Sequence, residues 1–293
     1  MDAAGDIGGT RVITSEQVFE VEEVLQGRRL WTVVEGDCRD LFPLLPNDSV
    51  ASVIADTPYS EHVHSKSRAG ARVLHGGPSS VTSRANISRK ADLGFDALTP
   101  DLRAACAVEF ARVARRWTLA FSDVESVHLW ERDLVAAGLD HVRVGAWVKL
   151  GGTPQFTGDR PGVGFEAIEI AHRTGRKRWN GGGHPGLWSH PIVHDRGAKT
   201  ANSEPRTNET QKPLALLVEL VGLFSDPGDL ILDPTCGSAT TGAASIRLKR
   251  RYIGCETRPE QVADARARLA AEEAGLVYGA VRAGQTSLFG VAS

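Results

Sequence analysis

The stretch DLILDPTCGSATTG at residues 229–242 identifies the fold class, because it passes from a strand through a small-residue turn into a helix. The apolar run ends at Asp233, and the residues after it are small enough for the backbone to approach a bulky ligand. Thr240 or Thr241 is expected to cap the following helix, which should continue to about Arg247. In open α/β sheets, a nucleoside-bearing cofactor commonly lies across such a turn.

The same segment lacks the two common phosphate-binding patterns. Its spacing is not G-x-G-x-x-G, and the chain has no G-x-x-x-x-G-K-[ST], so neither a dinucleotide nor a nucleoside triphosphate is favoured. A second short strand is expected at residues 251–256, and it ends in Glu256. An acid roughly twenty residues after the turn commonly accepts hydrogen bonds from ribose hydroxyls.

The tetrad Asp56-Thr57-Pro58-Tyr59 is the second informative segment, and it follows the apolar run at residues 50–55. This pattern predicts a buried strand that opens into a loop at the carboxyl edge of a sheet, where ligands bind. The carboxylate and a backbone carbonyl can accept the two hydrogens of an exocyclic amine, while the tyrosine ring stacks on a planar base. Taken alone, such a cluster is more often an ordinary turn.

Together the two segments resemble the beta class of DNA amino-methyltransferases that use S-adenosylmethionine. In that family a tetrad, usually Asp-Pro-Pro-Tyr, precedes a cofactor turn, usually Asp-Pro-Phe-x-Gly-Ser-Gly-Thr-Thr, and this chain has both in that order. The resemblance runs from about residue 31 to 275. Lesser similarities lie at Gly36-Asp37-Cys38, at Thr210-Gln211-Lys212-Pro213, at Arg160-Pro161 with Glu166, and at Trp179-Asn180-Gly181-Gly182 with Trp188.

The resemblance implies roles for particular residues. The implied catalytic residues are Asp56, Thr57, Pro58 and Tyr59. The implied contacts to S-adenosylmethionine come from Asp37, Cys38, Asp56, Lys212, Asp233, Pro234, Thr235, Cys236, Gly237, Ser238, Thr240, Thr241 and Glu256. No metal is expected, because the pair His62-x-His64 has no cysteine or carboxylate pattern near it.

The chain departs from the family pattern at three positions. Thr57 replaces the first proline of the tetrad, which keeps the acceptor carbonyl but leaves only Pro58 to stiffen the loop. Ala239 replaces the second glycine of the cofactor turn, and an alanine there is costly if its φ is positive. Thr235 replaces a phenylalanine that would pack near the cofactor. These changes leave room for a catalytically degenerate protein.

The net charge of −2 conceals two basic segments. Residues 65–90 contain six lysines and arginines and no acid, and residues 172–212 contain eight against three acids. A basic run is usually a solvated surface, but one run follows the tetrad and the other holds Trp179 and Trp188, which suits phosphate contact and base readout. The expected DNA-contacting residues are Lys66, Arg68, Arg72, Arg84, Arg89, Lys90, Arg176, Lys177, Arg178, Arg196 and Lys199.

Several residues bear on which base, and which atom of it, the protein would methylate. Methylation at cytosine carbon-5 would need a Pro-Cys dipeptide, and none of the 14 prolines is followed by cysteine. Asp56 at the first tetrad position favours the N6 amine of adenine, and N4 of cytosine remains the alternative. The acid and the basic segments argue against RNA or protein amide methyltransferases, which commonly have Asn-Pro-Pro-Tyr. A DNA-binding protein of the same fold without activity is a further alternative.

Alternating strand and helix patterns predict a doubly wound, mostly parallel, Rossmann-like α/β methyltransferase sheet in circularly permuted order. Strands are expected near residues 31–36, 50–56, 117–122, 142–149, 165–172, 229–233 and 251–256. Helices are expected near residues 99–115, 124–137, 212–225, 240–249 and 258–274. The strands that end at Asp56 and Asp233 are expected to be neighbours, which would place both motifs beside one crevice.

The 293 residues, 41% of them hydrophobic, divide into five expected parts. These are an N-terminal extension (1–30), a catalytic part (31–172, with a basic loop at 61–95), a loop-rich target-recognition insertion (173–210), a cofactor-binding part (211–275) and a tail (276–293). The cysteines (38, 106, 236, 255) are scattered, and we find neither a secretory signal nor an apolar run long enough to span a membrane. We therefore expect a cytoplasmic protein that acts on double-stranded DNA. The resemblance is compatible with a homodimer and with a cognate restriction endonuclease.

Overall fold

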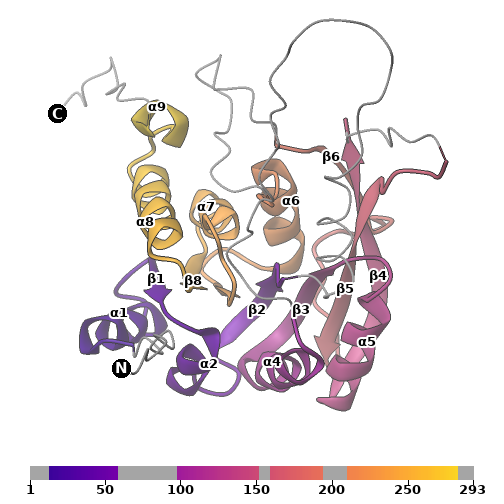
Figure 1. The fold of residues 1–293 in the computed structure, drawn as a ribbon. Coiled ribbons are helices and arrows are strands. Elements are labelled where there is room, and N and C mark those ends of the chain that lie inside the picture. The colour runs from indigo at the N-terminus through magenta and orange to yellow at the C-terminus, as the bar shows by residue number, and fades with distance from the viewer. Residues whose placement is uncertain (1–12, 59–97, 152–158, 194–209, 283–293) are drawn as a thin grey trace, which may run out of the picture.

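The core of the molecule is an eight-stranded sheet with strand order β1-β8-β7-β2-β3-β5-β4-β6 (Figure 1). A computed structural model describes residues 13–58, 98–151, 159–193 and 210–282. Neighbouring strands are parallel except at β5, which runs antiparallel to both β3 and β4. The expected mostly parallel α/β fold is confirmed. The strands are β1 (Trp31–Glu35), β2 (Val50–Ala55), β3 (Ala114–Ser122), β4 (Leu139–Leu150), β5 (Phe165–Arg173), β6 (Leu187–Pro191), β7 (Leu230–Asp233) and β8 (Arg251–Glu256).

Helices cover both faces of the sheet, and each face has its own apolar cluster (Figure 1). The cluster on one face contains the buried side chains of Val21, Phe110 and Leu134. The cluster on the other face contains those of Leu217 and Leu269. The first face carries α1 (Ser15–Leu25), α2 (Cys38–Leu41), the short 3-10 helix η1 (Phe42–Leu44), α4 (Pro100–Val113) and α5 (Val127–Ala136). The second carries α6 (Leu214–Phe224), α7 (Thr240–Arg247) and α8 (Pro259–Glu273), and α9 (Tyr278–Arg282) follows α8.

Helix α1 lies inside the segment expected to be an N-terminal extension. A capping box starts it, in which Thr14 Oγ1 accepts from the amide of Gln17 and Gln17 Oε1 accepts from the amide of Thr14, at 3.3 and 3.0 Å. Val21 and Val24 on its inner side are 0% exposed. The Thr-x-x-Gln spacing before an apolar stripe was a readable signal, and residues 15–25 are an integral part of the fold.

Strand β6 corrects the expectation that residues 173–210 have no regular structure. It adds to the sheet beside β4, with Trp188 paired to Trp147 in parallel register. Trp188 is only 1% exposed, and Trp179 packs against Phe224 with the ring centroids 4.9 Å apart. The prediction that these two tryptophans read bases is wrong for Trp188, because its ring belongs to the core cluster beneath α6.

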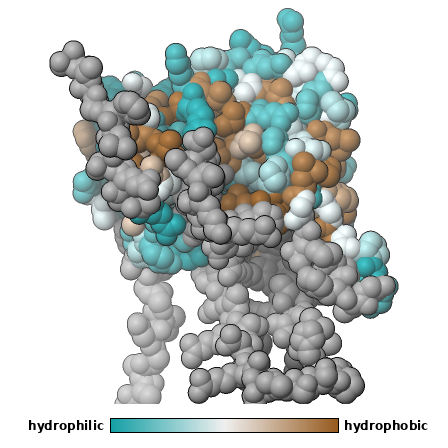
Figure 2. Space-filling model, turned by 90° about the horizontal axis from the view of Figure 1, so that it is seen from above, coloured by the Kyte–Doolittle hydropathy of each residue, from teal (hydrophilic) through white to brown (hydrophobic). Residues whose placement is uncertain are grey.

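The surface of the described residues gives no sign of a membrane-spanning segment. None of the helices in the described ranges combines the length and the apolar character needed to cross a bilayer. Hydrophilic and hydrophobic patches alternate on the described part of the face shown in Figure 2.

Candidate active site at the carboxyl edge of the sheet

Carboxylates stand at the carboxyl ends of four neighbouring parallel strands. Glu35, Glu256 and Asp233 end β1, β8 and β7, and Asp56 directly follows β2. The pairs Glu35↔Glu256 and Asp233↔Gly254 align these ends, and β2 pairs with β7 through Val53↔Leu232. The expectation that the strands ending at Asp56 and Asp233 are neighbours is confirmed. The resulting edge is acidic, which suits a ligand with cationic groups or hydroxyls.

Asp56 is held by a buried lysine at the start of α6. Lys212 Nζ lies 2.6 and 2.7 Å from Asp56 Oδ1 and Oδ2, and the Lys212 side chain is 5% exposed. Burial raises the pKa of Asp56, and the Lys212 charge opposes that shift. Burial also disfavours the charged form of Lys212, but its two carboxylate neighbours outweigh this and raise its pKa. The ammonium group of Lys212 bonds Asp56, and the expected contact of Lys212 with the cofactor stays a prediction.

Glu166 extends this pair into a row of alternating charges. Lys212 Nζ is 3.2 Å from Glu166 Oε2, and Lys149 Nζ is 2.6 Å from Glu166 Oε1. The row joins β2, β4, β5 and the start of α6, so elements far apart in the sequence fix the position of Asp56. Glu166 was predicted only through the resemblance, and Lys149 was not predicted. A charged residue inside the buried stretch at 165–171 was the available signal.

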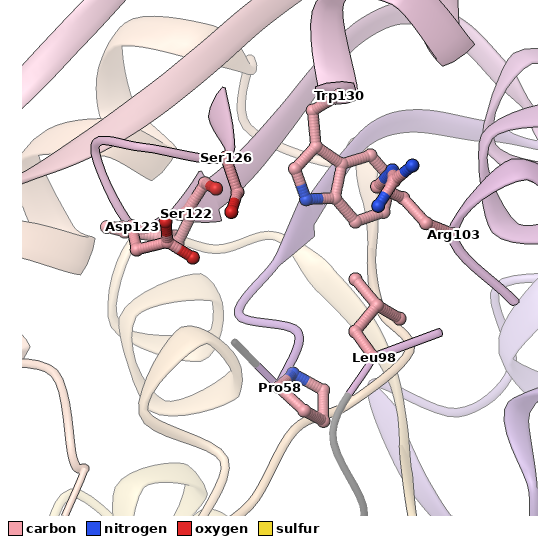
Figure 3. Close-up of a pocket in the computed structure, with 8 residues that line it drawn as sticks. Pro58, Leu98, Arg103, Ser122, Asp123, Ser126 and Trp130 are labelled. Carbon is pink, nitrogen blue, oxygen red and sulfur yellow. The ribbon is translucent and has the colours of Figure 1, made fainter. Parts of the chain in front are cut away.

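Of the remaining described residues of the tetrad, Thr57 is buried and Pro58 lines a small pocket. Thr57 is 3% exposed, and its Oγ1 is buried with no hydrogen-bond partner within the described part of the chain. Pro58 faces a pocket of about 10 Å³, which is enough for one water molecule. The polar residues Ser122, Asp123 and Ser126 form one wall, opposite Leu98, Arg103 and Trp130 (Figure 3), and Phe121 completes the lining. Tyr59 lies outside the described residues, so its expected stacking role stays a prediction.

The expected cofactor turn connects β7 to α7 with two residues of positive φ, Gly237 at 51° and Ala239 at 54°. Ala239 is the N-cap of α7 and makes no side-chain cap, so the expectation that Thr240 or Thr241 caps the helix is wrong. An alanine in this region costs about 1 kcal/mol relative to glycine. Behind the turn, the buried Arg268 donates to Thr240 Oγ1 at 3.0 Å and thereby ties the turn to α8.

Asp233 is the most deeply buried of the edge carboxylates, at 2% exposure. Burial raises the pKa of Asp233 to about 7; the charges of Asp56 and Glu256 add to this shift, while hydrogen bonds from Thr241 and the Thr235 amide oppose it. Thr235 Oγ1 is also buried and without a hydrogen-bond partner. The turn therefore has a carboxylate and a hydroxyl whose bonding capacity is not fully used by the protein.

The other expected cofactor contacts lie beside β1 and β8. The Asp37 side chain caps α2 by accepting from the Arg39 amide at 2.8 Å, and the Arg39 guanidinium lowers the pKa of Asp37. Glu256 Oε1 accepts from the Arg258 amide at 2.9 Å. Pro234, Cys236, Gly237 and Ser238 are all in the turn after β7, and Cys38 is the first residue of α2. All of these residues lie along the same end of the sheet.

The basic residues expected to contact DNA do not all lie near Asp56. Arg176, Lys177 and Arg178 follow β5, and because β5 is reversed they stand at the opposite edge of the sheet. Lys177 pairs there with Asp140 at 2.9 Å, and Arg178 with Asp226 at 3.0 Å. The expectation that these three flank the base-binding loop is therefore wrong. Lys66, Arg68, Arg72, Arg84, Arg89, Lys90, Arg196 and Lys199 lie outside the described residues.

The raised pKa of Asp233 predicts a pH-dependent stability. A carboxyl with a raised folded-state pKa binds its proton more tightly when folded, so this contribution to stability is lost as pH rises from the ordinary value of 3.8 to about 7. Asp233→Asn removes this titration. Relative to the wild type, its free energy of unfolding should rise by on the order of 3 kcal/mol between pH 4 and pH 8.

Urea unfolding of both proteins at the two pH values measures this difference. The same variant should lose cofactor affinity in calorimetry, because asparagine supplies no charge. An identical difference in unfolding free energy at both pH values would contradict the titration assigned to Asp233.

Comparison with known proteins finds DNA methyltransferases. A family model described as DNA methylase, for N6 and N4 methyltransferases, matches residues 146–267. The DNA adenine methyltransferase YhdJ of Escherichia coli (strain K12) is 40% identical over 76 residues, which is 26% of this chain and 24% of YhdJ. The Type II methyltransferase M.HinfI of Haemophilus influenzae is 22% identical over 250 residues, or 81% of this chain and 68% of M.HinfI. This chain thus spans about a quarter of YhdJ and about two thirds of M.HinfI.

Solved structures show the same fold. The M1.HpyAVI–SAM complex superposes with a TM-score of 0.57 at 19% identity, covering 82% of this chain and 98% of that one. The cytosine-N4-specific PvuII DNA methyltransferase superposes with a TM-score of 0.59 at 15% identity, covering 87% of this chain and 94% of that one. At such low identity these two likenesses establish the architecture of the chain and not its substrate.

Proposed function

This chain belongs to the family of N6-adenine and N4-cytosine DNA methyltransferases, and we propose that it methylates the N6 amine of adenine in duplex DNA with S-adenosylmethionine as cofactor. The observation that carries the proposal is the placement of Asp56. This residue follows β2, which pairs with β7, so it lies next to the turn after β7. Its Oδ1 atom is 2.6 Å from Lys212 Nζ. Adenine is favoured by aspartate at the first tetrad position. The likeness to YhdJ, itself described as an adenine methyltransferase, supports the same choice.

The residues at the sheet edge fit this cofactor. S-adenosylmethionine carries an ammonium, a sulfonium, a carboxylate and ribose hydroxyls. Asp233 offers a buried carboxylate beside these cations, and the buried Thr235 Oγ1 has bonding capacity to spare. Glu256, at the end of β8, would accept from ribose hydroxyls, and Asp37, the N-cap of α2 after β1, would contact the cofactor from the same edge. When bound, the cofactor supplies an activated methyl group.

Asp56 and Thr57 make the amine reactive in this proposal. The lone pair of an exocyclic amine is delocalised into the ring, so the nitrogen is a weak nucleophile. Accepting its hydrogens at the Asp56 carboxylate and the Thr57 carbonyl favours a pyramidal nitrogen with a directed lone pair. The raised pKa of Asp56 makes its carboxylate a better acceptor for the departing amine proton. Lys212 Nζ donates to both carboxylate oxygens of Asp56 and so fixes the orientation of that carboxylate.

A base inside a duplex is out of reach of such a site, so the target must be flipped out of the helix. Tyr59 would hold the flipped base by stacking. The lysines and arginines at residues 65–90, which directly follow the tetrad in sequence, are our proposed contacts to the phosphates, together with Arg196 and Lys199. Affinity for DNA should therefore fall steeply as the salt concentration rises.

The test is to incubate the protein with labelled S-adenosylmethionine and mixed-sequence duplex DNA, then digest the DNA to nucleosides. Label in N6-methyladenosine is the expected result. Label in N4-methylcytidine would move the substrate to cytosine and retain the family activity. Absence of label, together with absence of cofactor binding in calorimetry, would identify a DNA-binding protein without activity and overturn the proposal.

A further inference from the structure

Three potential metal ligands lie together on the face of the sheet that α5 covers. Glu131 comes from α5, His141 from β4 and Glu169 from β5, and one ligand atom from each residue lies within 4.8 Å of the others. Side chains alternate along a strand, and Glu169 is on the same face of β5 as Ala171, which belongs to the apolar cluster under α4 and α5. Glu166, in the proposed active site, is on the other face.

Glu169 has an unused carboxylate oxygen. Its side chain is 0% exposed, and Oε1 lies 2.7 Å from His141 Nδ1. The second oxygen, Oε2, is buried and has no hydrogen-bond partner among the residues that the structure describes. Burial raises the pKa of Glu169 to about 7, against the opposing effect of His141. A buried oxygen with no donor is unfavourable, and a cation at this place would compensate both its charge and its missing bond.

The cluster lacks the cation that such carboxylates normally require. Among the residues that the structure describes, no lysine or arginine forms an ion pair with Glu131 or Glu169. Glu131 is half-buried and His141 is exposed, with 32% of its side chain accessible, so an ion can enter from solvent. The three ligands come from a helix and two paired strands, which hold their backbones at fixed separations.

We propose that Glu131, His141 and Glu169 bind a Zn²⁺ ion. One imidazole nitrogen and two carboxylate oxygens are a ligand set that zinc accepts, with a water molecule in the fourth position. Metal ligands bind in their deprotonated forms, so Zn²⁺ affinity should weaken as the pH falls. Because the ligands join α5 to β4 and β5, a bound ion stabilises this end of the sheet.

The experiment uses the full chain after treatment with EDTA and dialysis. Zn²⁺ is titrated in calorimetry, and the melting temperature is measured with and without the ion. We expect one equivalent to bind and the melting temperature to rise, with no comparable effect of Mg²⁺, which prefers an all-oxygen set. In Glu131→Gln and Glu169→Gln, each of which removes a charged ligand at nearly constant volume, the affinity should fall at least ~10-fold.

The matched control is Glu125→Gln, an exposed glutamate just before α5 that should keep wild-type affinity. Failure of the wild type to bind Zn²⁺ would overturn the proposal. So would equal Zn²⁺ affinity in the wild type and in both ligand variants, because the ion would then sit elsewhere. These readouts do not involve methyl transfer, so their outcome is separate from that of the proposed function.

Discussion

Replacing Asp56 by asparagine is expected to lower the rate of methyl transfer at least ~10²-fold while the protein stays folded and binds DNA. The substitution removes the carboxylate that accepts the amine proton, and it leaves Lys212 with Glu166 at 3.2 Å as a partner. The loss should therefore fall on kcat and not on the affinity for DNA. Single-turnover transfer of labelled methyl groups, beside a DNA-binding titration, measures the two quantities separately.

Asp140→Asn is the matched control for this experiment. Asp140 is a half-buried aspartate at the start of β4, and it forms an ion pair with Lys177 at the edge of the sheet opposite Asp56. The control should transfer methyl groups at the wild-type rate. Retention of wild-type activity in Asp56→Asn would refute the role assigned to Asp56, whatever the modified base turns out to be.

Replacing Lys212 by methionine is expected to destabilise the fold and to stop methyl transfer. The change leaves Asp56 and Glu166 as close carboxylates without the cation that lies between them. Removing one partner of a buried ion pair typically costs 3–5 kcal/mol of unfolding free energy, roughly speaking, because an uncompensated charge remains. Denaturant unfolding gives the stability, and the labelled-methyl assay gives the activity.

A second variant separates the charge effect from the loss of the lysine side chain. In Lys212→Met combined with Glu166→Gln, the repulsion between the Asp56 and Glu166 carboxylates is removed as well. This double variant should recover part of the lost stability without recovering activity, because Asp56 is still unsupported. Additive effects of the two substitutions would show that the residues are not coupled and would argue against the row of alternating charges.

The segments that contain Asp56 and Asp233 could be predicted, because the pattern that identifies each one lies within a short stretch of sequence. A strand end, a turn and a helix start lie within the residues around Asp233, and a buried strand ends directly before Asp56. Their adjacency followed from the rule that parallel strands carry ligands at their carboxyl edge. Lys149 could not be found this way, since its partner Glu166 belongs to another strand and the contact exists only in the folded sheet.

The predictions that proved wrong, on the structure after β5 and on the position of its basic residues, concern a segment that is polar and glycine-rich. The composition of residues 173–193 is that of a solvated basic loop. In the structure, β6 nevertheless pairs at the edge of the sheet with Trp188 buried, because burying a large aromatic ring is strongly favourable. Arg178 was placed near the tetrad by composition alone. The direction of β5 decides its true position, and no local pattern reports strand direction. Ala239 was correctly singled out, and its positive φ of 54° makes it a strained site.

The reversal of β5 has a consequence for how this protein can change in evolution. The strand brings Glu166 to the row with Lys212 on one side of the sheet and Glu169 to His141 on the other. A single inserted or deleted residue between them would turn one acid onto the side of the other, since the side-chain period is two. The displaced acid would then lose its own partner, which is Lys212 for Glu166 and His141 for Glu169. The length of this segment is therefore constrained from both faces at once.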